Sequence, residues 1–103
     1  MTGRAEWTND QTTALFEAVL TLETVDEAEQ FFRDLCTLRE LGEMASRWQV
    51  ARLLARGIPY REISDETGAS TATVTRIAQW LRHGTGGYRM MLDRLGEPGE
   101  AAS

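Results

Sequence analysis

Residues 60–77 read YREISDETGASTATVTRI, and this stretch decides the fold because it has the spacing of a helix-turn-helix. The pattern predicts a first helix over Tyr60–Thr67 and a second over Thr71–His83. Gly68 falls where the turn between the helices needs a residue that adopts a positive φ without strain. Ser70 is a favourable N-cap for the second helix. The stretch therefore predicts two short helices that cross at a tight turn.

The second predicted helix has one apolar face and one polar face. The apolar residues, which we expect to be buried together with Ile63 of the first helix, are Val74, Ile77, Ala78 and Leu81. The opposite face carries small, hydroxyl, amide and arginine side chains, namely Thr71, Ala72, Thr75, Gln79 and Arg82. Such side chains read base edges and contact phosphates in the major groove, and no acid from Gly68 through Arg82 repels a phosphate. We therefore expect binding to double-stranded DNA. The alternative is a helix pair of the kind that also occurs in proteins that never contact DNA.

The sequence outside this motif predicts further helices and no strand. Apolar residues at three- and four-residue spacing predict a helix over Asp10–Leu22, one capped by Thr24 that runs to about Cys36, one over 38–56 and one over 88–95. In the last of these, we expect Met91, Leu92 and Leu95 to pack on the core. A length of 103 residues is that of one domain. We expect this domain to span residues 10–95, between disordered tails at 1–9 and 96–103.

The helix expected over residues 38–56 is apolar on two sides. One side carries Leu41, Met44, Ala45, Trp48, Ala51 and Ala55, and the other carries Val50, Leu53 and Leu54. Such a helix must be covered nearly all round, and five or six short helices leave few elements to cover it. We therefore expect a homodimer in which the helices of one chain pack into the other. The alternative is a monomeric bundle with this helix at its centre.

The net charge of −5 argues against a nucleic-acid partner until it is divided along the chain. Residues 1–43 contain three arginines and ten acids, a net charge of −7, whereas residues 44–94 contain eight arginines and four acids, a net charge of +4. Residues 95–103 add two acids, a net charge of −2. The predicted DNA-reading half is therefore basic. The net charge of the whole chain is still negative, which should suppress nonspecific binding and make the affinity for DNA modest.

Other functional classes have little support. His83 is the only histidine and Cys36 the only cysteine, and neither has a partner at catalytic spacing, so we expect no enzyme activity. No cluster with metal-ligand spacing and no glycine-rich phosphate loop is present, so we expect no metal and no cofactor. The first ten residues are polar, unlike a signal peptide, and no apolar run is long enough for a membrane span. The single cysteine cannot form a disulfide within the chain, and small secreted domains usually depend on disulfides. We therefore expect a cytoplasmic protein.

Two longer segments resemble a known family. LCTLRELGEMASRWQVARLLARG (35–57) and PYREISDETGASTATVTRI (59–77) are similar to the Trp-repressor superfamily, in particular to its YerC/YecD branch of small bacterial proteins. The resemblance implies an all-α fold of five to six helices, an intertwined homodimer with one helix-turn-helix per protomer, and a transcriptional regulator, a repressor by resemblance. The symmetry of such a dimer predicts a twofold-symmetric operator whose half-sites lie about 34 Å apart.

The family's DNA-contacting positions transfer to this sequence residue by residue. By resemblance, the positions nearest the bases are Arg61, Thr71, Ala72 and Thr75. The phosphate-contacting positions are Ser64, Ser70, Thr73, Arg76, Gln79 and Arg82. Ser64 replaces a basic residue, which should weaken phosphate binding, and Thr71 replaces an aliphatic residue, which should change the preferred operator.

The family's corepressor pocket is where this sequence departs most. Thr37, Arg47 and Arg76 match residues that surround tryptophan in the tryptophan-sensing members, but Ile77 and Trp80 replace a glycine and a serine. Because two larger side chains then stand where the ligand's ring must go, we expect that free tryptophan does not bind. A different small-molecule effector stays open. The main alternative to DNA binding is an acidic dimeric protein-interaction module that acts on a component of the transcription machinery.

Overall fold

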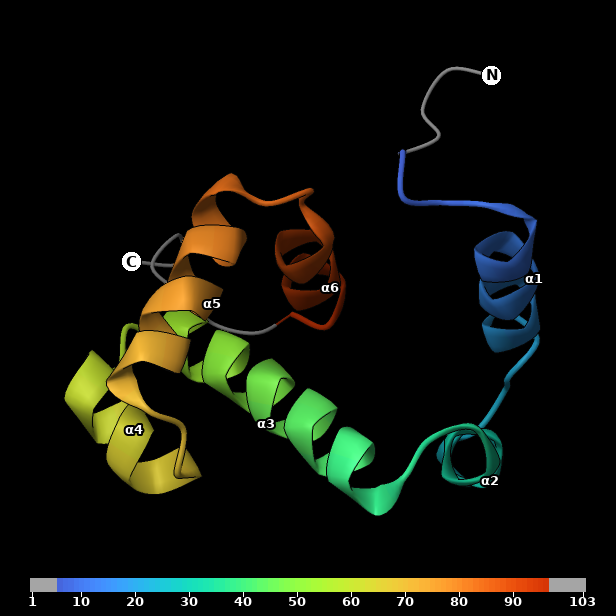
Figure 1. Cartoon of the computed structure of the whole chain (residues 1–103). Helices are drawn as coiled ribbons and strands as arrows, with labels where there is room; N and C mark the ends of the chain where they lie inside the picture. Colours follow the sequence, from blue (N-terminus) through green and yellow to red (C-terminus); the bar gives the residue numbers. More distant parts are fainter. Residues whose placement is uncertain (1–5, 97–103) are drawn as a thin grey trace. The chain divides into compact units, whose positions relative to one another are not determined.

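The computed structural model describes residues 6–96, and within them the chain forms six α-helices and no strand (Figure 1). The helices are α1 (Asp10–Val19), α2 (Val25–Leu35), α3 (Leu38–Ala55), α4 (Tyr60–Thr67), α5 (Thr71–His83) and α6 (Gly87–Arg94). The expected all-α fold is confirmed. The chain divides into an N-terminal unit that ends at Leu38 and a C-terminal unit that begins at Arg39.

Helix α1 begins where the sequence predicts but ends earlier. Asn9 and Thr12 form a capping box, in which the Thr12 N–H donates to Asn9 Oδ1 over 2.9 Å and the Asn9 N–H donates to Thr12 Oγ1 over 2.8 Å. The predicted end at Leu22 is wrong, because the helix stops at Val19. The Thr21 N–H and hydroxyl both donate to the Ala18 carbonyl, over 3.1 and 2.7 Å, which tightens the chain into a turn.

The tails expected at 1–9 and 96–103 lie mostly outside the described residues. Of the first, residues 6–9 are described, and there Asn9 caps α1 while the Trp7 ring lies edge-on to the Phe16 ring, with centroids 6.1 Å apart. Of the second, only Gly96 is described.

Helix α2 begins at the predicted cap. The Glu27 N–H donates to Thr24 Oγ1 over 3.0 Å, and the Glu27 carboxylate accepts from the Glu23 N–H over 2.9 Å, one residue before the N-cap. Neither α1 nor α2 contains a buried residue, although both carry the expected apolar stripes. Leu20, which follows α1, is 83% exposed. The N-terminal unit therefore has amphipathic helices but no core residue within them.

The core of the C-terminal unit is built by α3, α4 and α5. Its buried residues are Val50, Ala51, Leu53, Leu54, Ile63, Val74, Ile77 and Ala78. Helix α5 packs against both α4 and α6. All the residues expected to face inward from the helix-turn-helix are buried except Leu81, which is partly buried and packs on the cluster. Within the described part of the chain, no helix has the length and apolar character needed to cross a membrane.

Helix α3 contributes both of its predicted apolar sides to this core, but only in its second half. Val50 and Leu53 come from one side and Ala51 from the other. Leu41 and Met44, in the first half, are half-buried, and Ala45 is exposed. The first half of α3 is thus less completely covered than the second.

Helix α6 has the predicted position to within one residue at each end, but its packing differs from the prediction. Only Leu92 is buried, and Tyr88, four residues before it, is partly buried against the core. Met91 and Leu95 were expected to pack inward, and both are exposed. A helix of eight residues contacts the core along one line of side chains, and the pair at Tyr88 and Leu92 occupies it.

Candidate nucleic-acid interface

The turn between α4 and α5 is held by hydrogen bonds from short polar side chains. Gly68 has φ of 80°, the left-handed conformation predicted for it, and its N–H donates to the Ser64 carbonyl over 2.9 Å. The Ser64 hydroxyl donates to the Ala69 carbonyl over 2.5 Å, and the Thr67 hydroxyl accepts from the Ala69 N–H over 3.2 Å. These contacts fix the direction in which α5 leaves the turn.

The first turn of α5 is capped as predicted. Ser70 Oγ accepts from the Thr73 N–H over 3.1 Å and also lies 3.0 Å from the Thr73 hydroxyl. No acid occurs in this turn. The positive end of the α5 dipole therefore faces solvent without a carboxylate to neutralise it.

Helix α5 is anchored by one face and exposed on the other. Val74, Ile77 and Ala78 are at most 2% exposed, and Ile63 of α4 packs with them at 0%. On the opposite face the exposed residues are Thr71, Ala72, Thr75, Arg76, Gln79 and Arg82. The Thr75 hydroxyl donates to the Thr71 carbonyl over 2.9 Å, so its oxygen stays available as an acceptor. The helix thus presents small and polar groups on a rigid support.

Arg82 is held in place by a residue that sequence reasoning missed. Its Nη2 donates to the Tyr60 hydroxyl over 3.1 Å, which links the end of α5 to the start of α4. The two residues are 22 positions apart, so no local pattern signals the contact. Because a guanidinium has five N–H donors, this bond leaves Arg82 able to bind an anion.

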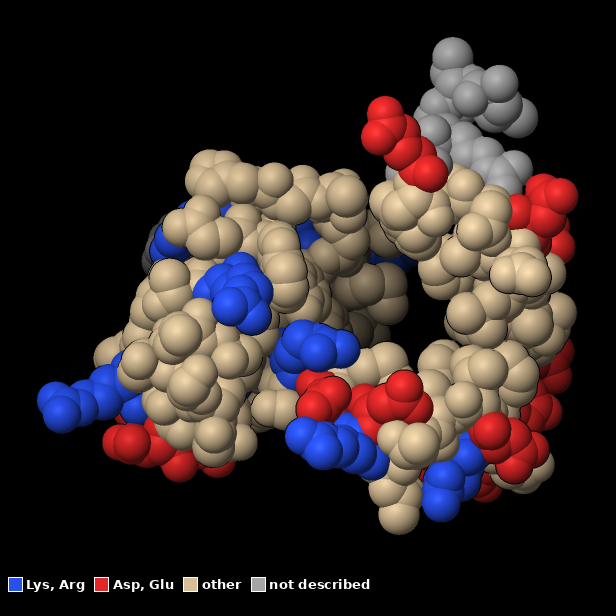
Figure 2. Space-filling view, in the orientation of Figure 1, with Lys and Arg blue, Asp and Glu red and all other residues tan. Residues whose placement is uncertain are grey.

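Charge is unevenly distributed over the molecule. Figure 2 shows acidic side chains along α1 and α2 and over α4, whereas none covers α5 in this view. The acid-free run is longer than the motif, since no Asp or Glu occurs from Gly68 through Leu92. The outer face of α5 is therefore suited to a polyanion.

The structure brings the predicted DNA-contacting residues together on α4, the turn and α5. The four positions expected nearest the bases, Arg61, Thr71, Ala72 and Thr75, are all exposed. Of the expected phosphate contacts, Ser70, Arg76, Gln79 and Arg82 are exposed. Ser64 and Thr73 are half-buried, and their hydroxyls already serve the turn and the cap.

The residues of the possible effector pocket come from both units of the chain. Thr37 belongs to the N-terminal unit, and Arg47, Arg76, Ile77 and Trp80 belong to the C-terminal unit. Ile77 is 1% exposed and lies in the core, whereas Arg76 on the same helix is exposed. Ile77 is therefore a packing residue in this structure.

Trp80 lines a hollow of about 860 Å³, and most of the side chains around this hollow are aromatic or methionine. The other large side chains around it are Trp48, His83, Tyr88, Met90 and Met91. The Trp48 and Tyr88 rings are stacked, with centroids 6.2 Å apart. Burial raises the pKa of the Tyr88 hydroxyl above its usual value, and the nearby charge of Arg47 opposes this shift. The lining of this hollow is mainly apolar. It therefore differs from a pocket in which two arginines bind the carboxylate of a small ligand.

The single cysteine and the single histidine belong to different units of the chain. Cys36 is half-buried at the end of α2 in the N-terminal unit, and His83 is exposed at the end of α5 in the C-terminal unit. Among residues 6–96, no three His, Cys, Asp or Glu side chains are grouped so that they could hold a metal ion.

Comparison with known proteins gives consistent matches over these helices. A family model described as Trp repressor protein matches residues 10–96. The uncharacterized protein YerC of Bacillus subtilis (strain 168) is 46% identical over 83 residues, which are 81% of this chain and 80% of YerC. A crystal structure of a candidate Trp repressor from Staphylococcus aureus has a TM-score of 0.85 and 41% identity, covering 90% of this chain and 93% of that one. A TrpR-like protein from Eubacterium eligens ATCC 27750 has a TM-score of 0.85 and 38% identity, covering 90% and 96%.

Proposed function

Because this chain belongs to the Trp repressor protein family, we propose that it is a sequence-specific DNA-binding regulator of transcription, a repressor by that membership. One observation carries the proposal, namely that α4, the Gly68 turn and α5 form a helix-turn-helix in which the outer face of α5 is polar, exposed and free of acids. A recognition helix needs such a face, because its side chains must approach base edges between two rows of phosphates.

The exposed residues divide into two roles. Thr71, Ala72 and Thr75 on α5, with Arg61 on α4, read the bases, because they are exposed and three of them are short enough for close approach. Arg76, Gln79 and Arg82 bind phosphates along the groove, together with the capping region at Ser70. Ser64 and Thr73 support this interface through the turn and the cap.

The regulator acts as an intertwined homodimer. Support comes from the N-terminal unit, where α1 and α2 bury no residue, although their apolar side chains have the spacing of a core-facing stripe. Those stripes need a cover, and the helices of a second copy supply it. Two recognition helices then fit half-sites about one helical turn apart.

Selection of bound duplexes from a random library, followed by analytical ultracentrifugation, tests the proposal. The free protein is expected to sediment with the mass of two chains, and the complex with that of one dimer per selected duplex. The selected sequences are expected to have twofold symmetry. A chain that sediments as a monomer contradicts the dimer, and failure to enrich any duplex contradicts DNA binding and favours the protein-interaction module.

Free L-tryptophan is expected to give no saturable heat in a calorimetric titration at micromolar to millimolar concentration. Ile77 is buried in the core and Trp80 carries a large ring at the position of the serine that the resemblance places beside the ligand. The duplex affinity is likewise expected to be the same with and without tryptophan. Saturable micromolar binding, or a tenfold change in duplex affinity, contradicts this prediction.

A further inference from the structure

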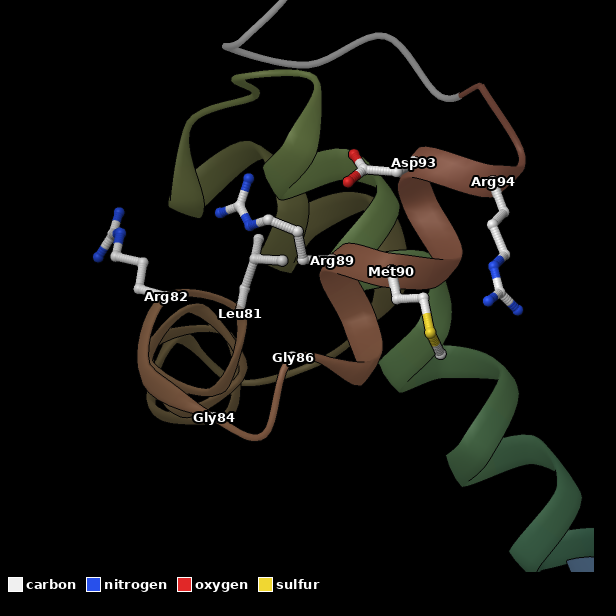
Figure 3. Close-up of a pocket in the computed structure, with 8 residues that line it drawn as sticks. All are labelled: Leu81, Arg82, Gly84, Gly86, Arg89, Met90, Asp93 and Arg94. Atoms are coloured by element: carbon white, nitrogen blue, oxygen red, sulfur yellow. The ribbon is translucent and has the colours of Figure 1, made fainter. Parts of the chain in front are cut away.

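A second hollow, of about 570 Å³, lies where the end of α5 meets α6 (Figure 3). Its lining includes Leu81 and Arg82 of α5 and Arg89, Asp93 and Arg94 of α6. Three arginines and one carboxylate give this lining a formal charge of +2. The hollow therefore has the electrostatic character of an anion site, and it extends from the end of the helix-turn-helix onto α6.

The loop from Gly84 to Gly86 places α6 against α5. Its first glycine follows α5 so closely that a Cβ there would collide with the Trp80 carbonyl oxygen. Gly86 has φ of 96°, a conformation that residues other than glycine rarely adopt. The short connection thus brings Arg89 to the same hollow as Arg82, on the flank of the recognition helix.

Arg82 and Arg89 differ in how the protein holds their side chains. Arg82 is oriented by the Tyr60 hydroxyl, whereas Arg89 is exposed and makes no hydrogen bond or ion pair within residues 6–96. In Figure 3 Leu81 lies between the Arg82 and Arg89 side chains, and the Asp93 carboxylate lies on the same side of α6 as the Arg89 guanidinium. Arg94 leaves α6 in a different direction.

We propose that Arg89 of α6, together with Arg82, binds a DNA backbone phosphate, so that the DNA interface extends beyond the helix-turn-helix onto α6. The proposal rests on the proposed function. A phosphate suits the site because the positive charges of its arginines outnumber the single carboxylate of Asp93 in the lining. Phosphates beside the major groove pass the flank of a recognition helix, which is where Arg82 and Arg89 lie.

The first test measures duplex affinity by fluorescence anisotropy from about 50 to 300 mM salt for the wild type, Arg89→Ala, Arg89→Lys and Arg94→Ala. Arg94→Ala is the control for net charge. Arg94 also lines the hollow, but its side chain leaves α6 away from Arg82 and Arg89, so the change removes the same charge from the same helix without removing the proposed contact. Arg89→Ala is expected to weaken binding about threefold to tenfold at low salt. It should also reduce the slope of log affinity against log salt by about 0.9 for each protomer that contacts the duplex. Arg89→Lys should retain most of the slope, and Arg94→Ala should have little effect.

The second test locates the phosphate. Duplexes carrying one uncharged methylphosphonate at successive positions outside the half-site should reveal a position where the substitution weakens the wild type. The same methylphosphonate should not weaken the binding of Arg89→Ala any further. The variant and the modified duplex each remove the same interaction, one from the protein and one from the DNA. An Arg89→Ala variant with wild-type slope and sensitivity overturns the proposal while leaving DNA binding intact.

Two further outcomes are decisive. Equal effects of Arg89→Ala and Arg94→Ala mean that only net charge matters, and they overturn a specific contact. If the wild type binds no duplex at all, the proposed function itself fails, and this inference fails with it.

Discussion

Replacing both Arg76 and Arg82 by alanine is expected to weaken binding to a selected duplex by about two orders of magnitude at 0.1 M salt. A dimer loses four phosphate contacts in this variant, so the salt slope should fall by about 3 to 4. Both side chains are exposed, and the only described contact that the change removes is the hydrogen bond from Arg82 to Tyr60. The fold and the dimer should therefore persist, which circular dichroism and sedimentation would verify.

The matched control for this variant is Arg33→Ala with Arg39→Ala. It removes the same charge from the acidic half of the chain, where Arg39 is 89% exposed and pairs with Glu43 over 3.6 Å. This control should bind the duplex nearly as the wild type does. If both double variants weaken binding equally, net charge rather than the α5 surface governs affinity, and the assigned interface is wrong.

Replacing Ile63 by alanine is expected to destabilise the protein by about 2 to 5 kcal/mol. Ile63 is 0% exposed and belongs to the core cluster that joins α3, α4 and α5. Its loss leaves a cavity between the two helices of the motif, because α4 contributes no other fully buried side chain. Urea unfolding followed by circular dichroism measures the change, at one fixed chain concentration because unfolding of a dimer depends on concentration.

Ile63→Val is the control for this change, and it should cost about 0.5 to 1.5 kcal/mol because it removes a single methylene group. Variants that still fold should lose duplex affinity as well, since α4 no longer orients α5. A loss below about 0.5 kcal/mol for the alanine variant would contradict the central packing role of Ile63.

The helix-turn-helix was predictable from sequence because its limits are set by local signals. Pro59 precedes α4, Gly68 ends it in the left-handed conformation, and Ser70 caps α5, so both predicted helices match the structure at both ends. The end of α1 was not predictable from periodicity alone. There the Thr21 hydroxyl competes for the Ala18 carbonyl, and apolar spacing does not report such competition.

The candidate site was predictable in its exposed residues and not in its contacts. Periodicity separates the inward Val74 and Ile77 from the outward Thr75 and Gln79, because one helix determines all four. The bond between Tyr60 and Arg82 depends on how two helices cross. The place of Arg89 depends on a glycine loop that folds α6 back, so the sequence signals its charge and not its neighbours.

The absence of buried residues in α1 and α2 affects how readily a single chain is degraded in a cell. A newly synthesised chain that has not met a second copy exposes these apolar stripes, and such surfaces attract chaperones and proteases. Assembly of the proposed dimer removes them from solvent, so survival depends on the encounter of two chains. At a low rate of synthesis, most chains would be degraded before they meet a second copy. The amount of functional regulator would therefore rise more steeply than the rate of synthesis.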